Sequence, residues 1–574
     1  MARIVSIGEQ DFGELLREDS FYIDKTYFIK EWWENRDKVT LIARPRRFGK
    51  TLTMSMLDHF FSIRHAGSGD LFEGLSVWED EKYRKLQGTH PVIFLSFASI
   101  KADCYEESCY GIRTLISREY RRHAYLLDSS DFLQADRKRF EKILLEEANV
   151  SEVSASINLL SEYLYNYYGK KVIILLDEYD TPMQEAYVYG YWKELIEFMR
   201  RFMNPTFKTN PYLERGLMTG ITRLSKESIF SDLNNLEVVM TTSNKYETAF
   251  GFTEEEVFAA LEEFGLEEQR QRVRRWYDGF RFGNCSSIYN PWSIVNYLKS
   301  KEFKPYWANT SSNKLAADLI QKGSPDIKMT MEDLLWGNSF CTYMDEEVVF
   351  NQLDSDENAV WSLLLAAGYL KAVEIIKSTD DYDIDQYRLT LTNAEVRQML
   401  ARMIHGWFSD GKTAYNSFEK ALLSDDVKGM NVFMNKIALN TFSCFDTGKK
   451  PSETAEPERF YHGFVLGLIV NLKKKYEITS NRESGFGRYD IMLAPAEGRT
   501  DGMILEFKVL DPDEESSLQD TAEAALRQII NKEYAAALEA KGVARTKIKI
   551  YGFAFSGKQV QIDGGCIVNY DQRI

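Results

Sequence analysis

The chain has few features that would place it in a membrane or outside the cell. No apolar run reaches about 18 residues, so no transmembrane helix is predicted. The N-terminal residues lack the long apolar core of a signal peptide. The six cysteines include no close Cys-x-x-Cys pair and the histidines are scattered, which predicts neither a zinc site nor a disulfide framework. These absences predict a cytoplasmic protein with no membrane partner and with free thiols.

An excess of positive charge is also absent. The 574 residues include 71 Lys and Arg against 87 Asp and Glu, which gives a formal net charge of −16. Proteins that coat nucleic acid by bulk attraction depend on concentrated Lys and Arg, so this class is disfavoured. Three short basic segments are candidates for local phosphate contacts, although such segments are more often solvated helix faces: residues 118–122, 270–275 and 473–475.

Size and composition indicate an ordinary globular protein of several domains. Hydrophobic residues make up 44% of the chain and charged residues 28%, and the length allows several sizeable cores. The sequence contains no internal repeat and no long low-complexity run. Function must therefore be sought in local motifs.

Two acidic residues near the C-terminus are spaced as in a metal-dependent nuclease. Fifteen residues separate Asp490 from Glu506. Successive side chains of a strand point to opposite faces, so Glu506 and Lys508 share one face while the apolar residues around them bury the other. If the preceding hairpin brings Asp490 alongside, two carboxylates can bind Mg²⁺ and the Lys508 ammonium can orient a water for attack on a phosphodiester. The alternative is an exposed Glu-Phe-Lys on an edge strand, which is common in any protein.

The elements around these acids follow a recognisable order. A helix is expected at 458–475, strands at 476–479, 489–493 and 503–509, an Ala-rich helix at 517–541 and a last strand at 548–555. Gly542 follows the Ala-rich helix as a C-terminal cap. Together with Asp490 and the Glu-Phe-Lys segment, this order resembles the PD-(D/E)XK nuclease superfamily, although Tyr489 stands where proline is typical.

The resemblance to these nucleases implies a role for five residues. Asp490 and Glu506 would be the Mg²⁺ ligands, and Lys508 would be the catalytic lysine. Glu458 on the first helix would be a further acid near the metals. Gln528 would match the helix glutamine found in some branches of the superfamily.

A second motif lies near the N-terminus. Residues 39–43 predict a short buried strand, which a phosphate-binding loop and an apolar helix follow. Arg44 occupies the position at which the usual loop has its first glycine. Gly49, Lys50 and Thr51 are intact. Their chemistry is clear, because backbone amides at a helix N-terminus face the phosphates, Lys50 neutralises β/γ charge and the Thr51 hydroxyl ligates Mg²⁺.

An unbroken apolar strand at residues 172–176 ends in acids, as a fully buried parallel strand should. It resembles a Walker B motif. Asp177 would hold the Mg²⁺ shell through water, and Glu178 would polarise the attacking water in ATP hydrolysis. Asp180, before Pro182, is interpreted as a turn or capping residue. The alternative is a buried strand that ends at a solvated acidic loop.

Two further strands, at 91–97 and 216–221, fit the same predicted sheet. The second leads into Arg223. This residue would lie near the γ-phosphate edge as a sensor or finger. The alternative is a surface arginine paired with an acid.

Several N-terminal segments together resemble the bacterial AAA-ATPase-like family. They are residues 22–26, 44–51, 176–180 and 220–223, and further similarity is found at 229–235, 276–280 and 289–293. In this family arginine before Pro-Arg-Arg-Phe-Gly-Lys is usual, so Arg44 agrees with the family. We expect ATP and Mg²⁺ as cofactors and count Arg46 and Phe48 of the loop among the ATP-binding residues. Members commonly end in a PD-(D/E)XK nuclease domain, in agreement with the C-terminal motif.

The fold class expected from these motifs is α/β, in four parts. They are a P-loop AAA-ATPase-like domain with a parallel sheet at 1–250, a helical lid at 251–345, a mostly helical or winged-helix-like middle region at 346–444 and a PD-(D/E)XK nuclease-like α/β domain at 457–574. The lid opens on a capping-box pattern at 251–256. The middle region would touch DNA or pack between the two chemical domains, and its acidic turn at 380–383 disfavours phosphate contact. Residues 445–456 have the composition of a hinge.

The combined expectation is an ATP-binding and ATP-hydrolysing protein that regulates a Mg²⁺-dependent nuclease acting on DNA or RNA, with DNA favoured. A use in phage defence or mobile-element biology is expected from family-level association alone. The alternative is a nucleotide-dependent switch that binds a partner through a non-cleaving nuclease-like domain. A motor is less favoured, because the sequence has no threading-loop or helicase signature. A homo-oligomer is a further option, since many ATPases complete their site with an arginine from a neighbouring subunit.

Overall fold

A computed structural model describes most of the chain. The described residues are 3–129, 132–221, 233–307, 314–344, 353, 356–377, 384–407, 415–441, 465, 468–469, 472, 475–484, 487–496, 501–511, 515–557 and 559–570. The chain divides into two compact units: unit 1 is Met1–Ala316 with Ser339–Arg397, and unit 2 is Ala317–Asn338 with Gln398–Ile574. The four-part boundaries expected from the sequence stay predictions. In the described part of the chain, no helix combines the length and apolar character needed to cross a bilayer.

Unit 1 is built around a parallel sheet. Its strands are β1 (Val39–Ala43), β2 (Val92–Ser96), β3 (Val172–Asp177), β4 (Leu213–Gly220) and β5 (Leu236–Val239). They pair in the order β2-β3-β4-β1-β5, all in parallel. β1 and β3 are buried along their whole length, as their unbroken apolar sequences predict. The predicted α/β class is confirmed, and β5 is an additional strand.

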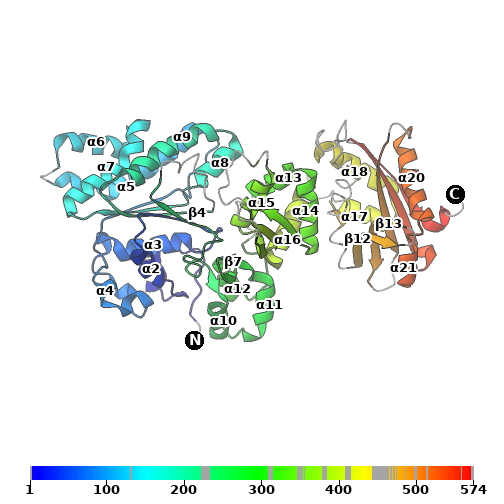
Figure 1. Cartoon of the computed structure of the whole chain (residues 1–574), viewed down its shortest axis with the longest axis horizontal. Helices are drawn as coiled ribbons and strands as arrows, with labels where there is room; N and C mark the ends of the chain where they lie inside the picture. Colours follow the sequence, from blue (N-terminus) through cyan, green and yellow to red (C-terminus); the bar gives the residue numbers. More distant parts are fainter. Residues whose placement is uncertain are drawn as a thin grey trace. The chain divides into compact units, whose positions relative to one another are not determined.

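Helices cover both faces of this sheet (Figure 1). One face carries α1 (Phe12–Arg17), α2 (Tyr27–Asn35), α3 (Lys50–Phe61) and α4 (Glu81–Arg84); the other carries α5 (Tyr105–Arg122), α6 (Gln134–Leu144), α7 (Val150–Tyr168), α8 (Thr181–Tyr189) and α9 (Trp192–Met203). Between the first group and the sheet, Trp32, Phe60 and Phe61 are fully buried in an aromatic core. This core fixes α3, and therefore the loop before it, against the strands.

The part of unit 1 that follows the sheet contains α10 (Glu254–Glu263), α11 (Arg270–Tyr277), α12 (Pro291–Ser300), β6 (Phe252–Thr253), β7 (Phe280–Phe282) and β8 (Cys285–Tyr289). The expected capping box is present at the start of α10, where Thr253 and Glu256 each accept from the other's backbone N–H. The antiparallel sheet β6-β8-β7 is an addition to the predicted helices. Its β7–β8 hairpin turns at Gly283, whose φ of 53° glycine adopts at little cost.

The middle of the chain is mostly helical, as predicted, with a second small sheet. Its helices are α13 (Lys314–Lys322), α14 (Pro325–Trp336), α15 (Glu357–Ala366), α16 (Ala394–Trp407), α17 (Tyr415–Leu423) and α18 (Val427–Thr441). Its strands β9 (Phe340–Tyr343), β10 (Leu370–Ile376) and β11 (Gln386–Leu391) pair in the order β10-β11-β9. The acidic turn at 380–383 and the expected hinge at 445–456 lie outside the described residues.

Unit 2 contains a mixed sheet. Its strands are β12 (Tyr476–Ser484), β13 (Gly487–Pro495), β14 (Gly502–Val509), β15 (Ile548–Ser556) and β16 (Gln559–Cys566), paired in chain order. β14 and β15 are parallel, and the other neighbours are antiparallel. Leu505 and Phe507 bury one face in the core shared with α17 and α18, while Ile504 packs in the core on the α20 side. The predicted nuclease-like α/β sheet is confirmed, with β16 as an additional strand.

The Ala-rich helix of unit 2 differs from the single helix predicted over 517–541. It is divided into α20 (Leu518–Asn531) and α21 (Ala536–Ala540). Between them Glu533 has a φ of 53°, a left-handed conformation that cannot continue an α-helix, and Tyr534 is buried beside it. The apolar periodicity runs across this turn, which is why the sequence pattern indicated one helix.

Side chains of α18 close the outer edge of β16. Asn431 Nδ2 donates to the carbonyl of Ile562 at 2.7 Å, and Asn431 Oδ1 accepts from the N–H of Ile562 at 2.8 Å. Asn435, one helical turn further on, makes the same pair of hydrogen bonds with Val560, at 2.6 and 3.0 Å. The two amides thus satisfy backbone groups that an open sheet edge would leave for another chain.

Replacing Asn431 or Asn435 by alanine should destabilise unit 2, because each change leaves a backbone N–H and a carbonyl of β16 without a partner. We expect a loss of about 1–3 kcal/mol of unfolding free energy for each variant. Urea unfolding of the full chain measures it. Val432→Ala, at a side chain that is 71% exposed on the same helix, is the control and should change stability by less than about 0.5 kcal/mol. Equal stability of the control and the asparagine variants would contradict the edge-closing role.

Candidate functional site

The loop between β1 and α3 has the geometry of a phosphate cradle. β1 ends at Ala43 and α3 begins at Lys50, with Gly49 at a φ of 81° directly before the helix. Because glycine has no Cβ, the chain can make this turn at little cost. The N–H groups of the first helical turn have no partner within the helix and are available to an anion. The strand, loop and helix follow one another as the sequence predicts.

Lys50 is held inside this loop. Its ammonium donates to the carbonyl oxygens of Arg44 and Pro45, both at 2.8 Å, and the residue is 5% exposed. Burial lowers the pKa of the Lys50 ammonium, while the carboxylates at the end of β3 oppose that shift. Phosphate oxygens entering the loop would offer this ammonium charged acceptors in place of neutral ones, which makes a stronger hydrogen bond.

Arg44, which replaces the usual first glycine, turns its side chain away from the loop. The guanidinium donates to the carbonyl of Met240, lies 3.5 Å from that of Lys245, and sits 4.4 Å from the centre of the Phe282 ring. The side chain is fully buried, and burial lowers the pKa of Arg44 to about 9. The carbonyl of Arg44, and not its side chain, meets Lys50. The arginine therefore ties the loop to the segment after β5 and to β7.

Hydroxyl groups surround Asp177 at the carboxyl edge of the parallel sheet. Thr51 Oγ1 donates to Asp177 Oδ2 at 2.8 Å, Thr219 Oγ1 to Oδ1 at 2.5 Å, and Ser96 Oγ to Oδ2 at 3.3 Å. Asp177 is fully buried, and burial raises the pKa of its carboxyl, although the hydroxyls act against the shift. The structure brings the predicted Thr51 and Asp177 together. Sequence reasoning missed Ser96 and Thr219, because only the strand order places the ends of β2 and β4 on either side of β3.

The donor set at Thr51 and Asp177 fits Mg²⁺. A hydroxyl and a carboxylate are hard oxygen ligands, the type that Mg²⁺ prefers, and their oxygens lie 2.8 Å apart. In the arrangement expected for a P-loop site, Thr51 would bind the ion directly and Asp177 would hold its hydration shell.

The two acids after Asp177 have different surroundings. Glu178 lines the cavity described below and accepts from Thr181 Oγ1 at 3.1 Å. Asp180 stands at the N-cap position of α8, but its side chain makes no capping hydrogen bond there. Its carboxylate instead accepts from the N–H of Ile221 at 2.9 Å and from Gln184 Nε2 at 3.1 Å. The interpretation of Asp180 as a turn or capping residue is therefore confirmed for its backbone, while its side chain joins the ends of β3 and β4.

Arg46 extends this network to the phosphate loop. Its guanidinium donates to Gln184 Oε1 at 2.7 Å, and Gln184 in turn donates to Asp180. The carbonyl of Arg46 accepts from Asn290 Nδ2 at 3.2 Å and from Trp307 Nε1 at 3.1 Å. The apex of the loop is thus bound both to α8 and to the residues around α12.

Phe48 anchors the same loop by packing. It is 1% exposed, and its ring centre lies 4.8 Å from that of Phe280 and 5.3 Å from that of Phe282. Its carbonyl accepts from the N–H of Gly251 at 3.3 Å. The predicted ATP-binding residue Phe48 therefore directs its side chain into the small sheet β6-β8-β7 and leaves its backbone on the loop.

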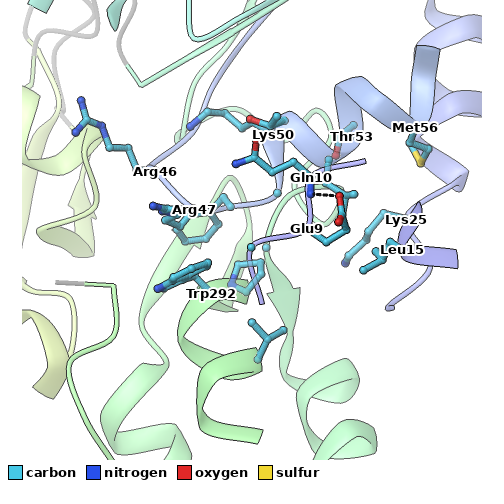
Figure 2. Close-up of a pocket in the computed structure, with 18 of the residues that line it drawn as sticks. Glu9, Gln10, Leu15, Lys25, Arg46, Arg47, Lys50, Thr53, Met56 and Trp292 are labelled. Atoms are coloured by element: carbon cyan, nitrogen blue, oxygen red, sulfur yellow. Dashed lines mark hydrogen bonds between the residues drawn. The ribbon is translucent and has the colours of Figure 1, made fainter. Parts of the chain in front are cut away.

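A cavity of about 380 Å³ opens beside the phosphate loop (Figure 2). Its walls come from the loop, α3, the N-terminal segment and the start of α12. The cationic side chains among them include Arg46, Arg47 and Lys50, and the apolar ones include Leu15, Met56 and Trp292. A cavity of this size, with apolar walls and a few fixed polar groups, suits a small ligand that carries negative charge.

A second site lies on the α20 side of the unit 2 sheet. Asp490 Oδ2 accepts from the N–H of Phe507 at 2.8 Å, and the N–H of Asp490 donates to Glu506 Oε2 at 3.4 Å. Neighbouring strands therefore bring the two predicted carboxylates together. Lys508 stands two residues beyond Glu506 on β14, so its side chain leaves the same face of the sheet.

Gln528 of α20 reaches this pair of acids. Its Nε2 donates to Glu506 Oε1, and Glu506 is 3% exposed. The same nitrogen lies 3.4 Å from the hydroxyl of Tyr534, whose pKa is raised by burial and by the nearby Glu506 and Asp490. Sequence reasoning missed Tyr534, because the turn between α20 and α21 brings it back to Gln528. Two carboxylates on adjacent strands supply the oxygen ligands that Mg²⁺ prefers.

Two predicted site residues lie outside the part of the chain that the structure describes. They are Arg223 and Glu458. Of the helix expected at 458–475, the described helical residues are Val465, Leu468 and Ile469. The roles of Arg223 and Glu458 stay predictions.

Two family models match the stretches of chain that contain these sites. Residues 6–230 match the family model described as a predicted AAA-ATPase, and residues 456–564 match that of the PD-(D/E)XK nuclease superfamily. An uncharacterised protein in the vnfD 5′ region of Azotobacter chroococcum mcd 1 is 25% identical over 569 residues, which is 96% of each chain. The chain therefore joins an N-terminal AAA-ATPase-like domain to a C-terminal domain of the PD-(D/E)XK nuclease superfamily.

Proposed function

We propose that the chain binds and hydrolyses ATP with Mg²⁺, and that its nucleotide state regulates a Mg²⁺-dependent phosphodiesterase acting on DNA or RNA, with DNA favoured. The contact between Thr51 and the buried Asp177 behind the phosphate loop is the observation that carries the proposal. The pairing of Asp490 with Glu506 supports its second half. A cytoplasmic location is part of the same proposal. A use in phage defence or mobile-element biology joins it through the family resemblance alone.

In the nucleotide site, each residue would have a separate task. The N–H groups at the start of α3 would bind the phosphates, and Lys50 would exchange its two carbonyl acceptors for β- and γ-phosphate oxygens. Mg²⁺ supplies charge neutralisation at those oxygens, with Thr51 and Asp177 as its protein partners. Glu178 would orient and polarise the attacking water from the cavity wall.

In the nuclease site, Asp490 and Glu506 would hold Mg²⁺ beside the scissile phosphate. The Lys508 ammonium would hold the attacking water on the same face of β14. Gln528 would fix the rotamer of Glu506 through its hydrogen bond to Oε1. Tyr534 would remain neutral and accept from Gln528, which keeps that amide in place.

A route for regulation begins at the phosphate loop. Arg44, Arg46 and Phe48 bind it to residues that follow the parallel sheet, through Phe282, Trp307 and Gly251 respectively. Loading the loop with phosphate would change the surroundings of these contacts, so the lid would have a nucleotide-free and a nucleotide-bound arrangement. Regulation requires such a two-state element.

A non-cleaving switch is the second candidate function. The observation in its favour is that Glu506 is buried and that its Oε1 already accepts from Gln528. In that case the nuclease-like domain would bind nucleic acid or a partner protein, and ATP turnover would occur without cutting.

Lys50→Ala should lose ATP binding, because it removes the ammonium that balances phosphate charge in a buried loop. We expect the Kd for Mg²⁺-ATP to rise at least about tenfold and turnover to disappear. Calorimetric titration measures the affinity, and a thermal melt checks that the fold is kept. Lys85→Ala, at an exposed lysine away from the cavity, is the control. Wild-type affinity in Lys50→Ala would remove this site from the account.

Asp490→Asn should abolish cleavage while keeping an oxygen to accept from the N–H of Phe507. The lost carboxylate charge is worth several kcal/mol of metal-assisted stabilisation, so the rate should fall by about 10³-fold or more. The assay uses Mg²⁺ with single- and double-stranded DNA and RNA. Glu523→Gln, at an exposed acid of α20, is the matched control. If wild type hydrolyses ATP but cuts none of these substrates, the non-cleaving switch replaces the nuclease as the proposed function.

A further inference from the structure

Arg47 has an unusual position in the phosphate loop. It adopts a left-handed backbone conformation, with a φ of 66°, and its side chain is exposed. The guanidinium lies 4.4 Å from the centre of the Trp292 ring, and both residues line the cavity. Figure 2 shows the two side chains next to each other, with Arg46 directed away from them. A left-handed conformation costs a non-glycine residue free energy, so the position of Arg47 on the loop calls for a reason beyond the backbone turn.

Trp292 is a fixed platform for this guanidinium. Its indole Nε1 donates to the carbonyl of Tyr306 at 3.3 Å. It stands in the first turn of α12, directly after Pro291, where Asn290 caps the helix by accepting from the N–H of Ser293 at 3.2 Å. Asn290 also donates to the carbonyl of the loop residue before Arg47. The ring is therefore held against the loop by the same residue that starts its helix.

The three loop cations that line the cavity have different partners. Lys50 donates to two loop carbonyls, and Arg46 donates to Gln184. Arg47, within the described part of the chain, has the face of Trp292 and makes no ion pair with a carboxylate. A guanidinium stacked on an indole keeps its N–H groups at its rim, where they can bind two oxygens of one phosphate.

We propose that Arg47 binds the phosphates of a nucleoside diphosphate or triphosphate, and that Trp292 holds the guanidinium in position for them. The proposal rests on the nucleotide site described above and adds a residue to it. It also gives α12 a direct contact with the ligand-binding cation. A phosphate bound to Arg47 would fix its guanidinium against the Trp292 ring. Because Trp292 belongs to α12, the presence of nucleotide would affect this helix.

The test measures Mg²⁺-ATP and Mg²⁺-ADP affinity by calorimetry, and tryptophan emission during the same titrations. The variants are Arg47→Gly, Arg47→Lys and Trp292→Phe in the full chain. Arg47→Gly removes the cation and also the cost of the left-handed conformation. Arg36→Ala is the matched control, because Arg36 is also exposed and left-handed, with a φ of 57°, but does not line the cavity.

The expected result separates binding from folding. Arg47→Gly should raise both Kd values roughly tenfold to hundredfold, as for a lost charged hydrogen bond, with an unchanged or higher melting temperature. Arg47→Lys should recover part of the affinity, and Arg36→Ala should change it by less than about twofold. ATP should change the emission of wild type, and this change should be absent in Trp292→Phe and in Arg47→Gly.

Three outcomes would overturn the inference, and they differ from one another. Wild-type affinity and emission change in Arg47→Gly would reject the role of Arg47 while leaving the nucleotide site intact. Absence of any nucleotide binding by the wild-type chain would reject the proposed ATPase function and this inference with it. A fall in both melting temperature and affinity for Arg47→Gly, with no recovery in Arg47→Lys, would show a structural role only.

Discussion

The carboxylate of Asp177 is buried at the end of β3, and hydroxyl groups from three neighbouring elements meet it there. A buried carboxylate is costly unless it is hydrogen-bonded, and its pKa rises with burial. The parallel order β2-β3-β4-β1 brings three segments to one edge of the sheet, so this carboxylate can accept hydrogen bonds from Ser96, Thr51 and Thr219 together. The phosphate loop starts at this same edge. The proposed nucleotide site thus depends on the order of strands in one sheet.

The loop itself is held from several sides. A glycine at its first position would leave only backbone contacts, whereas Arg44 carries a buried guanidinium to Met240 and Phe282. Phe48 and Trp307 fix its other end. The loop is thus held by contacts at several points, and a change at the phosphates would act on these defined neighbours. In unit 2, backbone N–H groups and the amide side chain of Gln528 likewise orient Asp490 and Glu506.

Much of the fold and of the candidate sites could be predicted from local sequence. The strand at 39–43, the acids after β3 and the capping box of α10 depend on apolar runs and short motifs, so they appear where the sequence places them. The partners of Asp177, the side-chain direction of Arg44 and the pairing of Arg47 with Trp292 depend on strand order and on residues far along the chain. The break at Glu533 escaped prediction because a left-handed residue leaves the apolar periodicity unchanged.

The central claim is that nucleotide state controls the nuclease site. The most direct measurement is the rate of DNA cleavage with Mg²⁺ and ATP, ADP or no nucleotide, for wild type and for Glu178→Gln, which should bind ATP but hydrolyse it slowly. The account predicts different rates for the three nucleotide states. It also predicts a difference over time in a reaction that starts with ATP. Glu178→Gln should keep the cleavage rate measured with ATP, whereas the rate of wild type should change to the one measured with ADP as ATP is consumed. One rate for both proteins under all three conditions would contradict it.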